Sequence, residues 1–266
     1  MSGAFLYDWL RTPRGRARPD GGLHDLSPFA LLDVLYRALA ERNGLDPSAV
    51  GEVVLGCVTQ HGEQAGNIAK TSTLHAGWPH SVSGITVNRF CSSGLDAINL
   101  AALKVAAGQE GLAVAGGIEM MSRVPMLADG AAVFTDAHLA AASRVLMMGS
   151  GADLVASLYD VSREQADAVA LASQQRAARA RAGGWFRSIV PVHNPVKGIT
   201  LAADECIREQ TTAESLARME PAFAALGADG VQEVAAGAQR MDAPGFRVAS
   251  HQHVVAGVEI DHGHAV

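Results

Sequence analysis

The fold is decided by the stretch Val87-Asn-Arg-Phe-Cys91-Ser-Ser-Gly94-Leu-Asp-Ala, where a short apolar run passes into a helical pattern. The run that enters it, Ile85–Val87, is typical of a strand. The segment that leaves it, Leu95–Ala107, places apolar side chains three and four residues apart, and Gly108 ends the pattern. Leu112–Ala115 then completes a strand–helix–strand unit, whose strands are expected to be parallel. The sequence therefore predicts a layered α/β fold.

The residues before this unit supply further elements of the same kind. Ala4–Leu10 and Val53–Cys57 are apolar enough for two more strands. Ser27-Pro28 is an N-cap followed by a first-turn proline, which predicts a helix that ends at Asn43-Gly44. Asn67–Ala76 is predicted to be helical as well.

After Gly117 the strand signal thins and capped helices replace it. Ser162-Arg-Glu-Gln165 is a capping box that opens a helix to about Arg181, and Thr211-Thr-Ala-Glu214 opens another before Pro221. We expect these helices to form an insertion. The predicted domains are an N-terminal α/β domain over residues 1–118, a loop domain over 119–245 and a divergent tail over 246–266.

Composition excludes several classes of protein. With 48% hydrophobic and 18% charged residues among 266, the chain can bury a core and is neither disordered nor a disulfide-stapled peptide. A net charge of -6 argues against nucleic acid as a partner. No run approaches the ~18 apolar residues of a membrane span, and three cysteines without a CxxC pair fit a reducing compartment. We expect a soluble, cytoplasmic protein that binds neither nucleic acid nor a membrane.

Cys91 is the residue with the clearest chemical potential. It lies where a strand ends and a helix begins, so its thiol faces free backbone N–H groups and the positive end of the helix dipole, which both favour the thiolate. The same N–H groups could hold the negative oxygen that forms when an ester or thioester carbonyl is attacked. A small buried cysteine packed at a turn is the alternative, because free cysteine is among the most buried residue types.

The stretch around Cys91 resembles the nucleophile elbow of the thiolases, the acyl-CoA acyltransferases that make or cleave 3-oxoacyl-CoA, and the resemblance extends in order from about Phe5 to Gly227. It implies an incomplete thiolase-like α/β/α fold with a helical loop domain inserted. The other matching segments include Arg11-Thr-Pro-Arg-Gly15, Gly56-Cys-Val-Thr-Gln60, Gln64-Ala-Gly-Asn-Ile-Ala-Lys70, Ala115-Gly-Gly-Ile-Glu-Met-Met-Ser122, Ile189-Val-Pro-Val192 and Asp204-Glu205.

The resemblance also implies roles for single residues. Cys91 would take the acyl group from an acyl-CoA, as in acetyl-CoA acetyltransferases and 3-ketoacyl-CoA thiolases. Met148 would lie near the pantetheine of CoA, and Arg208 and Ser215 near its nucleotide end, where a guanidinium can meet a phosphate or stack on adenine. Arg208 as a solvated charge and Ser215 as a polar first-turn residue are the alternatives. CoA and acyl-CoA are substrates, no cofactor or metal is implied, and a homo-oligomer is expected.

After Gly227 the family pattern decays. The Gly-His-Pro segment and the Cys-x-Gly segment, which in the family polarise the thioester oxygen and move the α-proton, are absent from the sequence. Claisen chemistry needs a base and enolate donors besides a nucleophile. We therefore expect a truncated chain, disrupted near Val231–Phe246, that lacks the C-terminal half and has impaired turnover.

Three alternatives stay open at this point. The first alternative to an impaired thiolase is a non-catalytic acyl-CoA-binding remnant, and the second is one half of a split thiolase. A dinucleotide oxidoreductase ranks last because no GxGxxG follows a predicted strand. Cys57 and Cys206 are interpreted as structural. His251-Gln-His253 and His262-Gly-His264 could grip a metal if the tail is extended, but no further ligand is evident and we predict no metal site.

Overall fold

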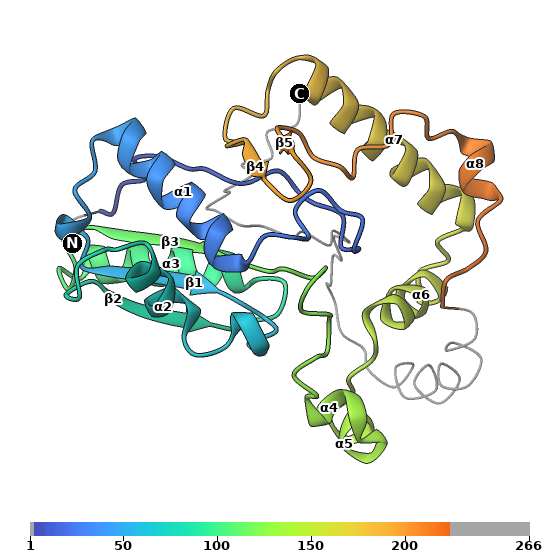
Figure 1. Cartoon of the computed structure of the whole chain (residues 1–266). Coiled ribbons are helices and arrows are strands. Elements are labelled where there is room, and N and C mark those ends of the chain that lie inside the picture. Colours follow the sequence, from blue (N-terminus) through green and yellow to red (C-terminus); the bar gives the residue numbers. More distant parts are fainter. Residues whose placement is uncertain (1–2, 224–266) are drawn as a thin grey trace. The chain divides into compact units, whose positions relative to one another are not determined.

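The computed structural model describes residues 3–223 and contains a three-stranded parallel sheet in its first compact unit (Figure 1). Its strands are β1 (Glu52–Gly56), β2 (Ser83–Val87) and β3 (Ala113–Gly117), in the order β2-β1-β3. Val54 stands opposite Ile85 on one side and Ala115 on the other. The predicted parallel strand–helix–strand unit is confirmed, with β1 inserted between its two strands.

One face of the sheet is covered by α1 (Pro28–Asn43) and α2 (Ile68–His75), whose apolar residues share a core with Val53 and Leu55 of β1. The predicted cap is present: the Ser27 hydroxyl accepts the N–H of Ala30 at 3.2 Å, and Gly44 ends α1 with φ 60°. Two short 3-10 turns, Pro47–Ala49 and Gly62–Gln64, flank β1.

The other face is covered by α3 (Ser93–Ala106), on which Ala97 and Ala101 bury Val54. Successive side chains of a strand point to opposite faces, so Val54 faces α3 while its two neighbours face α1 and α2. Helices on both faces of a parallel sheet confirm the predicted layered α/β architecture.

A later segment returns to this sheet-containing unit. Residues 186–206, with the antiparallel hairpin β4 (Val192–Asn194) and β5 (Ile199–Leu201), group with residues 3–129 as one compact unit. The Arg11 guanidinium donates to both carboxylate oxygens of Asp204, at 2.6 and 2.8 Å, and both side chains are buried. This bidentate pair fastens the loop after residue 10 to the returning segment.

The second compact unit comprises residues 130–185 and 207–223 and is helical. The capping box at Ser162 is confirmed, since its hydroxyl accepts the N–H of Gln165 and the Gln165 side chain accepts the N–H of Ser162. The three predicted domain ranges stay a prediction, and residues 246–266 lie outside the described part of the chain. The helices of this unit are α4 (Ala132–Thr135), α5 (Ala137–Ser143), α6 (Met148–Leu158), α7 (Arg163–Ala182) and α8 (Ala213–Ala217).

Two sequence predictions are wrong in detail. Ala4–Leu10 forms no strand: its backbone finds no partner strand within residues 3–223, and pairing begins only at Arg11, which bridges to Ile189. The last capping box is shifted by one residue, because Thr212 and Ser215 exchange the two cap hydrogen bonds that the sequence assigned to Thr211 and Glu214. Ser215 can take the last position of this capping box because its hydroxyl both accepts and donates hydrogen bonds.

Within the described residues no single helix is long and apolar enough to cross a membrane. The bent pair of α5 and α6 meets the length and composition criteria only when its two helices are taken together.

Candidate active site

Cys91 lies in the turn that joins β2 to α3, and its side chain is exposed. The predicted location at the start of a helix is therefore found: Ser92 is the N-cap residue and Ser93 the first residue of α3. An exposed thiol at a helix start contradicts the alternative of a cysteine buried in packed side chains.

The residue before the cysteine adopts an unusual backbone conformation. Phe90 has φ 48°, in the left-handed region that residues with a side chain rarely occupy. Such a conformation costs on the order of 1–3 kcal/mol and persists only where surrounding contacts hold it. Phe90 lies between the end of β2 and the start of α3, directly before the exposed Cys91.

Ser93 makes some of the contacts that hold Phe90 in this conformation. Its buried hydroxyl accepts the N–H of Arg89 at 2.8 Å and donates to the carbonyl of Phe90 at 2.6 Å. The N–H groups of Ser92 and Ser93 bond back to the carbonyls of Arg89 and Phe90, at 3.1 and 3.0 Å. Two N–H groups of this helix start are therefore occupied within the turn and are not available to an oxyanion.

A glycine on the neighbouring strand lets the helix start approach the sheet. A Cβ atom on Gly56, the last residue of β1, would lie 2.3 Å from the backbone carbon of Ser93 and 2.5 Å from the nitrogen of Gly94. Real Cβ atoms essentially never come so close, so only glycine fits at this position. The end of β1 thus sets the depth at which α3 begins.

An ion pair spans the turn on its exposed side. The Arg89 guanidinium donates to the carboxylate of Asp96 in the first turn of α3, and this hydrogen bond raises the pKa of Arg89. Because Asp96 neutralises Arg89, an anion at Cys91 would depend on the helix start and its dipole more than on this arginine.

The other two cysteines differ from Cys91 and from each other. Cys57 is buried, and burial together with the nearby Glu119 carboxylate raises its pKa to about 12. It therefore stays a neutral thiol, which suits the predicted structural role. Cys206 is exposed and follows Glu205, whose carboxylate accepts backbone N–H groups of the loop after residue 10.

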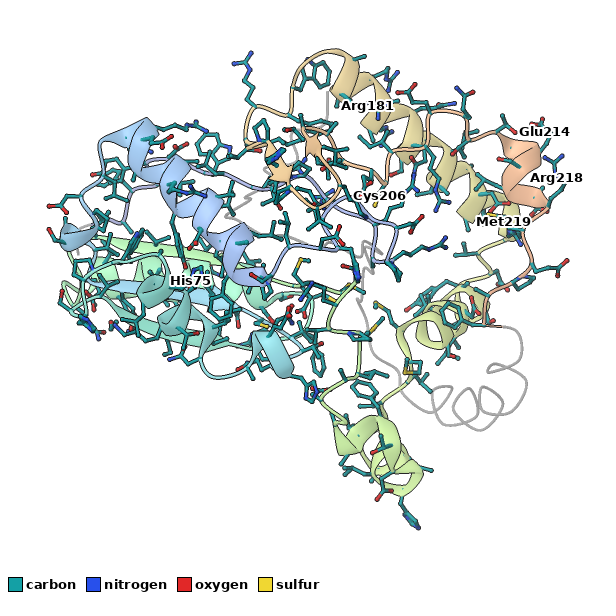
Figure 2. All side chains as sticks on the ribbon, in the orientation of Figure 1. His75, Arg181, Cys206, Glu214, Arg218 and Met219 are labelled. Atoms are coloured by element: carbon teal, nitrogen blue, oxygen red, sulfur yellow. The ribbon has the colours of Figure 1, made fainter. Side chains whose placement is uncertain are left out.

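The second unit contains an open hollow of about 680 Å³. Figure 2 labels Arg181 on α7 and Met219 just after α8, and both line it. Arg208 and Ser215, two of the predicted CoA-binding residues, line the same hollow, whereas Met148, the exposed first residue of α6, does not. The structure brings together two of the three residues.

Arg208 and Arg181 are in different states. The backbone of Arg208 is fixed, because its N–H donates to Gln174 at 2.7 Å and its carbonyl accepts the hydroxyl of Thr211 at 2.8 Å. Arg181 is paired with Glu209, while within residues 3–223 no hydrogen bond or ion pair engages the Arg208 guanidinium. The Arg208 guanidinium, in the lining of this hollow, therefore has no counter-ion among residues 3–223.

Ser215 has a structural task in addition to any binding role. Its hydroxyl accepts the N–H of Thr212 at 3.0 Å and donates to the Thr212 carbonyl at 2.7 Å, which caps α8. Its placement on the first turn of a helix, the alternative raised by the sequence, is found. The oxygen can accept one more hydrogen bond from a ligand.

Sequence reasoning missed Ser93 and Asn88, the side chains that bond the backbone of the turn. Asn88 accepts the N–H of Phe90 at 2.8 Å. Asparagine and serine are residues whose short side chains hydrogen-bond nearby backbone, so their placement on both sides of Cys91 was a usable signal. In the described part of the chain no group of His, Cys, Asp or Glu is arranged to bind a metal, and both His-x-His pairs lie outside that part.

Comparison with known proteins gives consistent matches. Residues 6–238 match the family model described as "Thiolase, N-terminal domain". The beta-ketoadipyl-CoA thiolase of Pseudomonas aeruginosa is 44% identical over 82% of this chain and 59% of its own length, and the 3-ketoacyl-CoA thiolase of Bacillus subtilis is 38% identical over 85% and 61%. The crystal structure of the Bacillus anthracis acetyl-CoA acetyltransferase superposes with TM-score 0.72 and 32% identity, covering 84% of this chain and 59% of that one. The chain thus spans about 60% of the length of these relatives.

Proposed function

The chain belongs to the thiolase family, and from this membership we propose that Cys91 accepts an acyl group from an acyl-CoA thioester. The single observation that supports this most directly is the exposed Cys91 thiol at the start of α3, next to a residue held in a left-handed conformation. An accessible sulfur at a helix N-terminus is the arrangement that favours a thiolate nucleophile.

The Cys91 thiolate attacks the thioester carbonyl and forms a new carbon–sulfur bond, and the carbonyl oxygen becomes an oxyanion. Collapse of this tetrahedral intermediate breaks the bond to CoA, which leaves as a thiolate and takes up a proton. The product is an acyl-cysteine, from which the family passes the acyl group to the α-carbon of a second acyl-CoA or back to CoA sulfur.

Formation or cleavage of the carbon–carbon bond requires further groups besides the Cys91 nucleophile. The Gly-His-Pro segment, which in the family polarises the thioester oxygen, and the Cys-x-Gly segment, which moves the α-proton, do not occur in these 266 residues. We therefore propose acyl-enzyme formation as the reaction of this chain and carbon–carbon bond formation or cleavage as a reaction that requires those segments in addition.

We further propose that the hollow beside α8 receives the nucleotide end of CoA. Support comes from the unengaged guanidinium of Arg208, which can meet a phosphate or stack on adenine, and from the Ser215 hydroxyl in the same lining. Met148 is proposed as a pantetheine contact on the resemblance alone.

The test is to incubate the purified chain with acetyl-CoA and to search for an acetyl adduct by intact-protein and peptide mass spectrometry. We expect the adduct on Cys91 and none in Cys91→Ala. The exposed Cys206 is an internal control, because an adduct on both thiols would indicate non-specific acetylation. Absence of any adduct on Cys91 would overturn the proposal.

A second candidate, acyl-CoA binding without chemistry, is favoured by the location of the hollow on residues that do not include Cys91. Calorimetric titration with CoA separates the two. Binding that is lost in Arg208→Ala and retained in Cys91→Ala, with no adduct in the wild type, would favour the binding protein.

We propose the cytoplasm as the compartment, supported by three cysteines that are all free thiols. We also propose self-association, supported by the exposed outer strand β2, on which Ile85 remains 37% exposed. Light scattering of the purified chain tests the second proposal, and a monomeric mass would contradict it.

A further inference from the structure

Asn88 holds the turn before Cys91 from two sides. It is the first residue after β2, and its side-chain oxygen accepts the N–H of Phe90 at 2.8 Å. Its side-chain nitrogen donates to the carbonyl of Val58 at 3.1 Å. One carboxamide therefore connects the left-handed residue that precedes Cys91 to the segment that follows the neighbouring strand β1.

Val58 is itself fixed by a charged group. Its N–H donates to one carboxylate oxygen of Glu119 at 2.8 Å, and the second oxygen accepts the Gln64 side chain at 2.7 Å. Glu119 follows β3 and Val58 follows β1. The ends of all three parallel strands are thus tied together through these contacts.

Gln64 anchors this chain of hydrogen bonds in the interior. It is fully buried, its oxygen accepts the N–H of Met120 at 2.5 Å, and its nitrogen also donates to the carbonyl of Thr59 at 2.9 Å. These partners fix the orientation of the Gln64 amide, because a flipped amide would place its NH2 group against the N–H of Met120. Glu119 accordingly accepts two N–H donors, one on each carboxylate oxygen.

We propose that Asn88 is a positioning residue for Cys91, held in place through Val58 by Glu119 and Gln64. The inference rests on the proposed role of Cys91 as acyl acceptor. A left-handed phenylalanine relaxes unless its surroundings hold it, and Asn88 bonds the N–H of Phe90 while Ser93 bonds its carbonyl. Loss of the Asn88 contacts lets the peptide before Cys91 rotate, which moves the sulfur away from the start of α3.

The experiment uses the full chain as wild type, Asn88→Ala and Asn88→Ser. The rate of acetyl transfer from acetyl-CoA to Cys91 is measured against acetyl-CoA concentration. In Asn88→Ala we expect the maximal rate to fall by roughly ten-fold or more, because misplacement of a reacting atom is costly. The half-saturating concentration should stay within about two-fold, because Asn88 is not in the CoA hollow. Asn88→Ser should recover part of the rate, since a serine hydroxyl can accept the N–H of Phe90.

A second measurement does not depend on acyl transfer. The alkylation of Cys91 by iodoacetamide is quantified by peptide mass spectrometry relative to Cys206 in the same molecule. We expect this ratio to fall in Asn88→Ala and in Glu119→Gln. The latter variant keeps the Asn88 side chain and changes only the group that holds Val58 and Gln64, so a fall in the ratio would reflect the support of Asn88 and not its own loss.

Asn67→Ala is the matched control. The Asn67 side chain also makes two hydrogen bonds to β2 residues, donating to the carbonyl of Gly84 at 2.9 Å and accepting the hydroxyl of Thr86 at 2.8 Å. It lies at φ 55°, so alanine there also loses a favourable left-handed residue. We expect a loss of stability with Cys91 reactivity unchanged.

The outcomes separate the inference from the proposed function. If wild-type Cys91 takes no acetyl group, the proposed function fails, and the alkylation ratio alone decides whether Asn88 positions the sulfur. If folded Asn88→Ala is acylated and alkylated within about two-fold of the wild type, the inference is refuted. The same refutation follows if Asn67→Ala lowers Cys91 reactivity as much as Asn88→Ala does.

Discussion

Replacing Gly56 with alanine is expected to push the start of α3 away from the end of β1. The new methyl group would lie 2.3 Å from the backbone carbon of Ser93, while real Cβ atoms essentially never come within 3.0 Å. The helix start must therefore retreat by about 0.7 Å, the difference between 3.0 and 2.3 Å. The atoms in the way belong to the backbone, so no side chain can swing aside to absorb the overlap.

This overlap should cost both stability and reactivity. Overpacking a well-packed site costs about 1–3 kcal/mol, and we expect the upper part of that range because the backbone itself must move. Ser93 pins the carbonyl of Phe90, so its retreat also displaces the turn that carries Cys91. A displacement approaching 1 Å can slow a reaction by up to about a hundred-fold, so acyl transfer to Cys91 should fall by at least ten-fold.

Gly84→Ala is the matched control, because a Cβ on Gly84 would lie 2.4 Å from the backbone nitrogen of Lys70 in α2. This overlap is similar to the one at Gly56, but it involves α2, on the opposite face of the sheet from α3. Urea unfolding and single-turnover acetyl transfer are measured for both variants. We expect similar losses of unfolding free energy, with acyl transfer reduced only in Gly56→Ala. Equal rates in the two variants would refute the reasoning that Gly56 sets the start of α3.

Three further predictions concern other parts of the chain. Burial alone would raise the pKa of Asp204, but hydrogen bonds from Arg11 and the loop backbone outweigh burial and lower that pKa. The pair therefore contributes its full stability at pH values above the ordinary pKa of 3.8, and this contribution is lost as the pH falls through the lowered pKa. Asp204→Asn should cost about 3–5 kcal/mol at neutral pH, because the buried Arg11 cation then lacks its neutralising carboxylate, and should weaken the acid dependence of urea unfolding; an unchanged acid dependence would contradict this. The pKa of Cys57, raised to about 12, predicts that this thiol resists iodoacetamide at pH values where Cys91 and Cys206 react, and that stability falls as pH rises above about 9, because only the unfolded chain then ionises it. Ser162→Ala should cost about 1 kcal/mol of unfolding free energy by removing the capping box of α7, and a thermal scan within error of the wild type would count against the observed cap.

The sequence was most informative where the signal is local. The apolar spacing in α3, the proline and glycine at the ends of α1 and the capping box before α7 each predicted the element that the structure contains. These features depend on residues within one or two turns of each other, so the chain needs no distant partner to show them. The location of Cys91 at a helix start followed from the same local reasoning.

What the sequence could not show depends on partners far along the chain. The apolar residues of Ala4–Leu10 suggested a strand, but a strand exists only with a neighbour, and the described residues provide none. The pairing of Glu119 with Gln64 joins residues that no periodicity relates. The left-handed conformation of Phe90 was equally hidden, because phenylalanine is not a residue type that marks such a turn.

The bidentate contact between Arg11 and Asp204 has a consequence for how the molecule is made. On the ribosome the arginine is synthesised 193 residues ahead of the carboxylate that neutralises it, with residues 130–185 of the second unit translated in the interval. The cation must stay hydrated during that time, so the loop after residue 10 can dock only at a late stage of synthesis. Released chains that end shortly before and shortly after residue 204 should therefore differ in the protease resistance of their first twenty residues.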